Sequence, residues 1–147
     1  MKKLYHLSEE NLDGRTLSPR VPKNSLTSWG VEENDIPRIS FCSSVSKCLM
    51  AISRNIEGKE FYVHTIDTNK TDVNKVSNNI QQPSEELVPD VRYTHEVWIK
   101  TPVVLKMIGK IKVLKSDDMP IHKFTIDIPG GTYNAELAEW KYKKINT

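Results

Sequence analysis

The feature that most constrains this fold is a strand pattern that changes into a helix pattern at two adjacent serines. Residues 38–42 (RISFC) alternate polar and apolar side chains, as in a half-buried strand. Residues 45–52 (VSKCLMAI) then place apolar side chains at i, i+3, i+4 and i+7, the spacing of an amphipathic helix. Ser44 stands at the N-cap position, and backbone N–H groups left free at such a helix start suit an anion. We therefore predict a strand, a turn at Ser43 and Ser44, and a helix.

Most of the remaining pattern is typical of strands. Short β-prone or alternating runs separated by polar turns predict strands at 4–7, 60–66, 94–99, 109–114 and 123–128. The last two can form a hairpin across 115–118, and a short apolar segment spans 103–107. The tail from 134 to 145 (NAELAEWKYKKI) is predicted to form an amphipathic helix that caps the domain. These elements predict an α+β domain with mostly antiparallel strands.

Two segments interrupt this pattern. Residues 13–37 hold three prolines and two glycines with little periodicity, which predicts a loop-rich segment of the kind that often binds ligands. Residues 67–90 are polar and contain Pro83 and Pro89, so we interpret them as a mobile surface loop. With 147 residues, the whole chain (1–147) is expected to form one domain.

Composition excludes several classes of protein. Lys and Arg total 21 against 19 Asp and Glu, a net charge of +2, which is far from the balance of a nucleic-acid coat but leaves small anionic ligands open. The two cysteines, Cys42 and Cys48, are too few for a disulfide framework or a closed zinc site, and we expect both to be buried. The sequence has no apolar run long enough for a membrane span and no signal-peptide pattern at its start. We expect a cytoplasmic protein with no membrane partner.

Three side chains stand out as candidates for chemistry. His6 and His64 each lie within a predicted strand, where an isolated histidine is more often structural than functional. The pair could hold a metal if neighbouring strands aligned them, but no third ligand stands out, so no metal site is predicted. Glu96 lies in an apolar strand on the same face as Trp98. A carboxylate there is costly unless it is paired or functional, although a solvent-exposed strand face would accommodate it equally well.

Three segments, taken in order, resemble the ADP-ribosyltransferase superfamily. Residues 4–8 (LYHLS) resemble its first-strand histidine motif, and residues 38–52 (RISFCSSVSKCLMAI) resemble its central strand, which ends in serines and runs into a helix. Residues 95–113 (HEVWIKTPVVLKMIGKIKV) resemble the late strand that carries the family's glutamate. The resemblance implies a split, mostly antiparallel β-sandwich with one or two packing helices, which clamps NAD in a cleft as its substrate.

The resemblance also implies residue roles. The catalytic residues would be His6, which would bond the adenosine-side ribose of NAD, and Glu96, which would bond the nicotinamide ribose and stabilise an oxocarbenium-like transition state. Segment 67–90, with the residues up to Tyr93, would lie where the family places its acceptor-recognition loop. Thr94 stands where many protein-modifying members carry Glu or Gln, which argues against arginine as the acceptor. The other NAD-binding candidates are serines for the nicotinamide pocket and arginines, chosen on charge and position, for the pyrophosphate: Ser40, Ser43, Ser44, Arg20 and Arg38.

Three functions follow as hypotheses. The first is an NAD-dependent enzyme that transfers ADP-ribose to a protein or nucleic-acid acceptor, or to water as an NAD glycohydrolase. The second is a non-catalytic module that sequesters a nucleotide signal, for example as a phage counter-defence protein. The third is a protein–protein interaction domain whose long loops form the recognition surface. Glu96 discriminates between the first two, because only an enzyme requires its carboxylate for a reaction.

Overall fold

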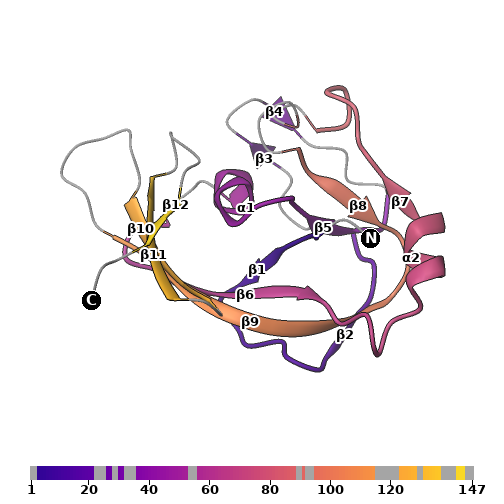
Figure 1. The fold of residues 1–147 in the computed structure, drawn as a ribbon. Helices are drawn as coiled ribbons and strands as arrows, with labels where there is room; N and C mark the ends of the chain where they lie inside the picture. The colour runs from indigo at the N-terminus through magenta and orange to yellow at the C-terminus, as the bar shows by residue number, and fades with distance from the viewer. Residues whose placement is uncertain are drawn as a thin grey trace.

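Two antiparallel sheets form the body of the protein (Figure 1). The structure is a computed structural model that describes residues 3–21, 26–27, 30–31, 36–52, 56–88, 91, 95–114, 123–128, 131–136 and 142–144. The larger sheet has seven strands in the order β1-β6-β9-β10-β11-β12, with β2 paired to β9. Its strands are β1 (His6–Ser8), β2 (Thr16–Leu17), β6 (Glu60–Ile66), β9 (Val103–Val113), β10 (Lys123–Ile128), β11 (Gly131–Glu136) and β12 (Tyr142–Lys144).

The smaller sheet has three strands in the order β5-β8-β7. These are β5 (Ile39–Phe41), β8 (Val97–Ile99) and β7 (Ile80–Gln81). A separate pair of two-residue strands, β3 (Leu26–Thr27) and β4 (Gly30–Val31), lies within the segment predicted to be loop-rich. All of these pairings are antiparallel, which confirms the predicted α+β class with mostly antiparallel strands.

The long strand β9 contributes to both clusters of the core. Val103 and Leu105 belong to a buried cluster shared with β5 and β8 of the smaller sheet. The pairing of β9 with β6 shifts register between Val63 and His64, and beyond this irregularity Ile111 and Val113 belong to a second cluster shared with α1 (Val45–Ile52). Figure 1 shows the helix and the smaller sheet on the same side of the β6–β9 ribbon.

The strongest sequence patterns are confirmed. The helix predicted at 45–52 and the strand predicted at 60–66 have those bounds in the structure. The two segments 103–107 and 109–114 instead form the single eleven-residue strand β9, which pairs with β10 as the predicted hairpin requires. Neither of the described helices, α1 with eight residues and α2 (Val73–Asn78) with six, could cross a membrane.

The interpretation of 67–90 as a loop is wrong for its central part. This segment contains α2 and β7, and β7 adds a third strand to the smaller sheet by pairing with β8. Asp72 caps the helix by accepting hydrogen bonds from two backbone N–H groups, and Val76 is fully buried in the core. The polar composition hid this unit because a single buried apolar residue anchors the helix and backbone pairing alone holds the strand.

The predicted helix at 134–145 is also wrong within the described residues. β11 continues to Glu136, and β12 pairs antiparallel with it, with Tyr133 opposite Lys144 and Ala135 opposite Tyr142. Residues 137–141 and 145 lie outside the described residues. The pairing of β11 with β10 and β12 prevails over the helix propensity of the Ala, Glu and Lys residues, which amounts to only a few tenths of a kcal/mol per residue, about 0–0.7.

Candidate functional site

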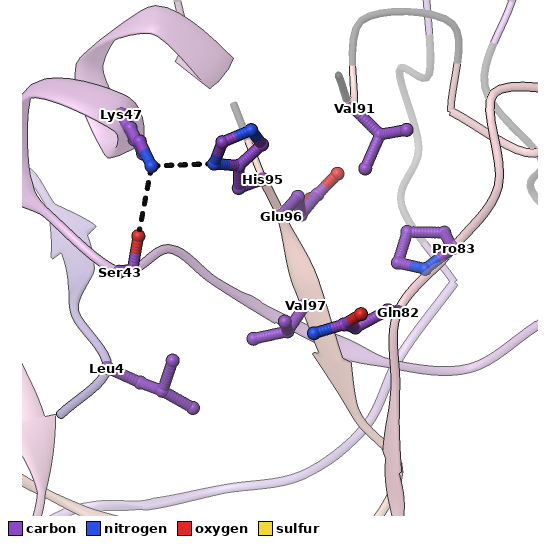
Figure 2. Close-up of a pocket in the computed structure, with 9 residues that line it drawn as sticks. All are labelled: Leu4, Ser43, Lys47, Gln82, Pro83, Val91, His95, Glu96 and Val97. Atoms are coloured by element: carbon purple, nitrogen blue, oxygen red, sulfur yellow. Dashed lines mark hydrogen bonds between the residues drawn. The ribbon is translucent and has the colours of Figure 1, made fainter. Parts of the chain in front are cut away.

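A cavity of about 390 Å³ opens where the start of β8 meets the turn between β5 and α1 (Figure 2). This volume lies at the small end of the range of known ligand pockets, roughly 300–1,000 Å³. In Figure 2, the residues near β1 and α1 stand on one side and those that follow β7 stand on the other. The lining residues are Leu4, Ser43, Lys47, Gln82, Pro83, Val91, His95, Glu96 and Val97.

Glu96 is the buried carboxylate of this cavity. It immediately precedes β8, and only 6% of its surface is exposed. The alternative of a solvent-exposed strand face is therefore wrong for this residue. Because an ionised carboxylate loses favourable hydration when it is buried, its position in a cavity wall is the kind of arrangement that functional sites retain.

A chain of polar contacts borders the same cavity. The Lys47 ammonium donates to Nδ1 of His95 over 2.6 Å and to Oγ of Ser43 over 3.4 Å. Figure 2 shows these three side chains gathered on one side of the cavity, beside Glu96. Ser44, in contrast, caps α1, since its Oγ accepts the backbone N–H of Lys47 over 3.2 Å. Of these two adjacent serines, Ser43 lines the cavity and Ser44 does not.

The backbone at His95 is strained. Its φ is 50°, in the left-handed region that residues with a Cβ rarely adopt and that costs roughly 1–2 kcal/mol. Two contacts hold it there: its N–H donates to the Val91 carbonyl over 2.8 Å, and its ring accepts the bond from Lys47. Such strain concentrates at functional sites, where the surroundings hold a conformation that the isolated chain would avoid.

His6 is not one of the residues that line this cavity. Its Nδ1–H donates to the Ser40 carbonyl over 3.0 Å, and its ring centroid is 5.6 Å from that of Phe41. Burial lowers the pKa of His6 from its ordinary value of 6.5, and the charge of Arg20 lowers it further, although the bond to Ser40 acts in the opposite direction. The neutral ring leaves Nε2 as an acceptor, as a bond to a ribose hydroxyl would require.

His64 is a structural residue. It is fully buried, directly opposite His6 in the register of β1 and β6. Its Nε2 accepts the backbone N–H of Leu12 over 2.9 Å, and its Nδ1–H donates to the His6 carbonyl over 3.3 Å. Burial lowers the pKa of His64 as well. Both ring nitrogens are thus used, and among the described residues no group of three or more His, Cys, Asp and Glu side chains could hold a metal ion.

Arg20 and Arg38 do not line the cavity. Their backbones pair, with Arg20 N–H donating to the Arg38 carbonyl over 3.2 Å and the reverse bond measuring 3.0 Å. Arg38 is 4% exposed, and its guanidinium lies with Cζ 4.1 Å from the ring centroid of Trp98 and donates to the Ile36 carbonyl. Arg20 is exposed. The arginines expected at a pyrophosphate thus lie apart from the residues that surround the cavity.

Both cysteines are buried free thiols, as predicted. The Cys48 thiol donates to the Tyr5 carbonyl over 3.2 Å. A hydrogen bond with Cys48 and burial both raise the pKa of the Cys42 thiol. A thiol that remains protonated is a poor nucleophile, so Cys42 lacks the surroundings of a reactive cysteine.

The sequence interpretation missed three polar residues of the cavity. Lys47 is the only charged residue of the 45–52 helix, and this was the one signal that could have found it. His95 gave no signal of its own beside Glu96. Gln82 follows β7, inside the segment interpreted as a loop.

In the part of the chain that the structure describes, the fold and the site define a small α+β protein with two main antiparallel sheets, a short β3–β4 pair, two short helices and a polar cavity beside the smaller sheet. No protein-family model, curated protein or solved structure matches the chain.

Proposed function

We propose that this protein is an NAD-dependent ADP-ribosyltransferase that uses the cavity to hold the nicotinamide and its ribose. The observation that carries the proposal is the buried carboxylate of Glu96 in the cavity wall. The order of the three sequence segments supports it, because Glu96 and Ser43, assigned to NAD from separate segments, line one cavity. The acceptor is a macromolecule, with water as the competing nucleophile.

Glu96 would act on charge that develops during the reaction. When the bond between C1′ of the ribose and the pyridinium nitrogen breaks, the electron pair leaves with neutral nicotinamide and the ribose becomes an oxocarbenium ion. A carboxylate shielded from water stabilises that cation more strongly than an exposed one, because the local dielectric is low. The nucleophile then forms its bond to C1′ and releases its proton to solvent water.

His6 would act beyond the cavity wall. Its Nδ1–H is committed to the Ser40 carbonyl, so the ring is oriented and Nε2 can accept a bond from a ribose hydroxyl. This arrangement supports the role assigned to His6 at the adenosine side of NAD. Ser43, whose Oγ borders the cavity, is the serine suited to the nicotinamide pocket.

The test is release of nicotinamide from NAD, measured by chromatography, in the wild type, Glu96→Gln and the control Glu86→Gln. Glu86 is exposed and does not line the cavity. We expect Glu96→Gln to lose at least about 10²-fold in rate while it still binds NAD, because transition-state stabilisation is removed, and Glu86→Gln to keep its rate. Equal rates in Glu96→Gln and wild type would refute the role of Glu96. NAD bound tightly and recovered intact from the wild type would instead identify a nucleotide-sequestering protein.

A further inference from the structure

We infer that Ser43, Lys47 and His95 form a binding site for a phosphoryl oxyanion at the edge of the cavity. The three side chains come from the β5–α1 turn, from α1 and from the residue before Glu96, and Lys47 bonds to the other two. The inference rests on the proposed function only in one respect, which is that the nucleotide whose phosphates could occupy the site is NAD. The chemistry of the site follows from the hydrogen-bond directions.

Lys47 fixes which groups remain for a ligand. An ammonium group has three N–H donors and no acceptor, and two of them are directed at His95 and Ser43. No described residue accepts from the third N–H, which leaves it for a ligand. Because His95 accepts at Nδ1, its neutral ring carries the proton on Nε2, which makes that nitrogen a second donor.

Ser43 supplies the third donor. Its Oγ accepts from Lys47, so its own O–H is left to donate elsewhere. The groups that remain are thus an ammonium N–H, an imidazole N–H and a hydroxyl. Three donors around a positive charge match a phosphoryl group, which offers several acceptor oxygens and negative charge. A cationic ligand would be repelled by Lys47.

The strain at His95 supports a function for this arrangement. A positive φ at a histidine disfavours the folded state, and here it allows the ring to meet Lys47 while the next residue, Glu96, enters the cavity wall. The oxyanion would lie on the Lys47 side, because the carboxylate of Glu96 repels it. Phosphoryl recognition and stabilisation of a cation would then occupy neighbouring positions in one cavity.

The phosphoryl group has two possible sources. It can belong to the nucleotide itself, in which case Lys47 takes the role that the sequence assigned to Arg20 and Arg38. Alternatively, it can belong to a second molecule that enters the same cavity and presents a phosphate. Both sources share the chemistry of an ionised phosphoryl oxygen that accepts several hydrogen bonds.

Inorganic pyrophosphate is the direct probe. We would measure its affinity by calorimetry and its effect on Tm for wild type, Lys47→Met and the control Lys106→Met, whose lysine is exposed on β9 away from the cavity. We expect pyrophosphate to raise the Tm of wild type and Lys106→Met, and its affinity to fall at least about tenfold in Lys47→Met, because a charge-assisted contact is lost. Ser43→Ala, a milder change, should weaken binding in the same direction.

The inference is overturned if wild type does not bind pyrophosphate, or if Lys47→Met and Ser43→Ala both bind it as wild type does. The Tm of each unliganded variant shows whether it is folded. Should Lys47→Met fail to fold, Ser43→Ala and Lys47→Gln decide the question.

A second set of binding measurements, with NAD and nicotinamide riboside, distinguishes the two sources of the phosphoryl group and tests the oxyanion site separately from the proposed function. If Lys47→Met weakens NAD at least about tenfold but leaves nicotinamide riboside, which has no phosphate, unchanged, the site binds the nucleotide's own phosphates. If NAD affinity is unchanged in Lys47→Met and NAD and pyrophosphate bind together, the site binds a second molecule. If no NAD-derived ligand binds while pyrophosphate binding still depends on Lys47, the proposed function fails and the oxyanion site stands.

Discussion

At the scale of single residues, His6 and His64 show that one residue type can have two different roles. The two face each other across β1 and β6, and His64 bonds through both ring nitrogens. Backbone groups hold the His64 ring on both sides, so its role is structural. Among the described residues, His6 bonds only through Nδ1, and its Nε2 is the acceptor that a ligand could use.

Both histidines make stability depend on pH. Burial lowers their pKa values in the folded state from an ordinary value of 6.5, so the folded protein disfavours the protonated form and the unfolded chain does not. The stability that the neutral rings contribute is therefore fully present above pH 6.5. It is lost progressively as the pH falls from 6.5 toward the depressed values, by about 1.4 kcal/mol per pH unit for each histidine.

Urea unfolding at a series of pH values between 8 and 4 checks this expectation. The slope of unfolding free energy against pH should be shallower in His64→Gln than in wild type, since one of the two titrating groups is gone. A wild-type stability that does not change between pH 6.5 and the onset of carboxyl protonation, about pH 4–5, would contradict the expectation.

At the scale of elements, local signals identified α1 and β6 because their side chains repeat with a clear period. The α2–β7 unit gave no such signal, since its core contribution is the single buried Val76 and its strand has two residues. β12 was missed for another reason: residues 134–145 also carry helix-forming residues, and no alternating apolar pattern marks the pairing of β11 with β12. Elements without a clear apolar period are thus the ones that sequence reasoning missed.

The same contrast holds at the candidate site. Glu96 and Ser43 were found because they lie in recognisable strand and turn patterns. Lys47 and His95, 48 positions apart, meet only in the folded chain, where the Lys47 side chain of α1 contacts a residue just before β8. Their contact required the three-dimensional arrangement of both elements.

The N-cap of α2 offers a test at this scale. Asp72→Ala removes the side chain that accepts from two backbone N–H groups, and we expect the unfolding free energy to fall by about 1 kcal/mol. Because Gln82 and Pro83 follow this helix and line the cavity, the variant should also weaken ligand binding.

Urea unfolding and pyrophosphate calorimetry measure the two effects. Ser77→Ala, an exposed position inside the same helix, serves as the control, and its stability should change by less than about 0.5 kcal/mol. An Asp72→Ala variant as stable as Ser77→Ala would show that the cap contributes nothing.

At the scale of the whole molecule, β9 contributes residues to both core clusters. The smaller sheet packs in one cluster and α1 packs in the other, so the elements on the two sides of the cavity are both anchored to the same strand. The relative position of Lys47 and Glu96 therefore depends on packing along the full length of that strand.

Leu49 tests this dependence. It is fully buried on α1, two residues after Lys47, and Leu49→Ala should lower the unfolding free energy by about 2–5 kcal/mol because it leaves a cavity in the core. Chemical denaturation gives the value, with Leu114→Ala as the control. Leu114 is 37% exposed, so its replacement should cost less than about 1 kcal/mol. Similar losses in the two variants would mean that α1 is not anchored as its burial indicates.

The two buried thiols have a practical consequence. Cys42 directly precedes Ser43, Cys48 directly follows Lys47, and both thiols are buried in the folded protein. A small alkylating reagent can therefore reach them only when this region opens, and its reaction rate would report how often it does so. Alkylation of the two cysteines would therefore measure how often the protein opens locally at the edge of the cavity.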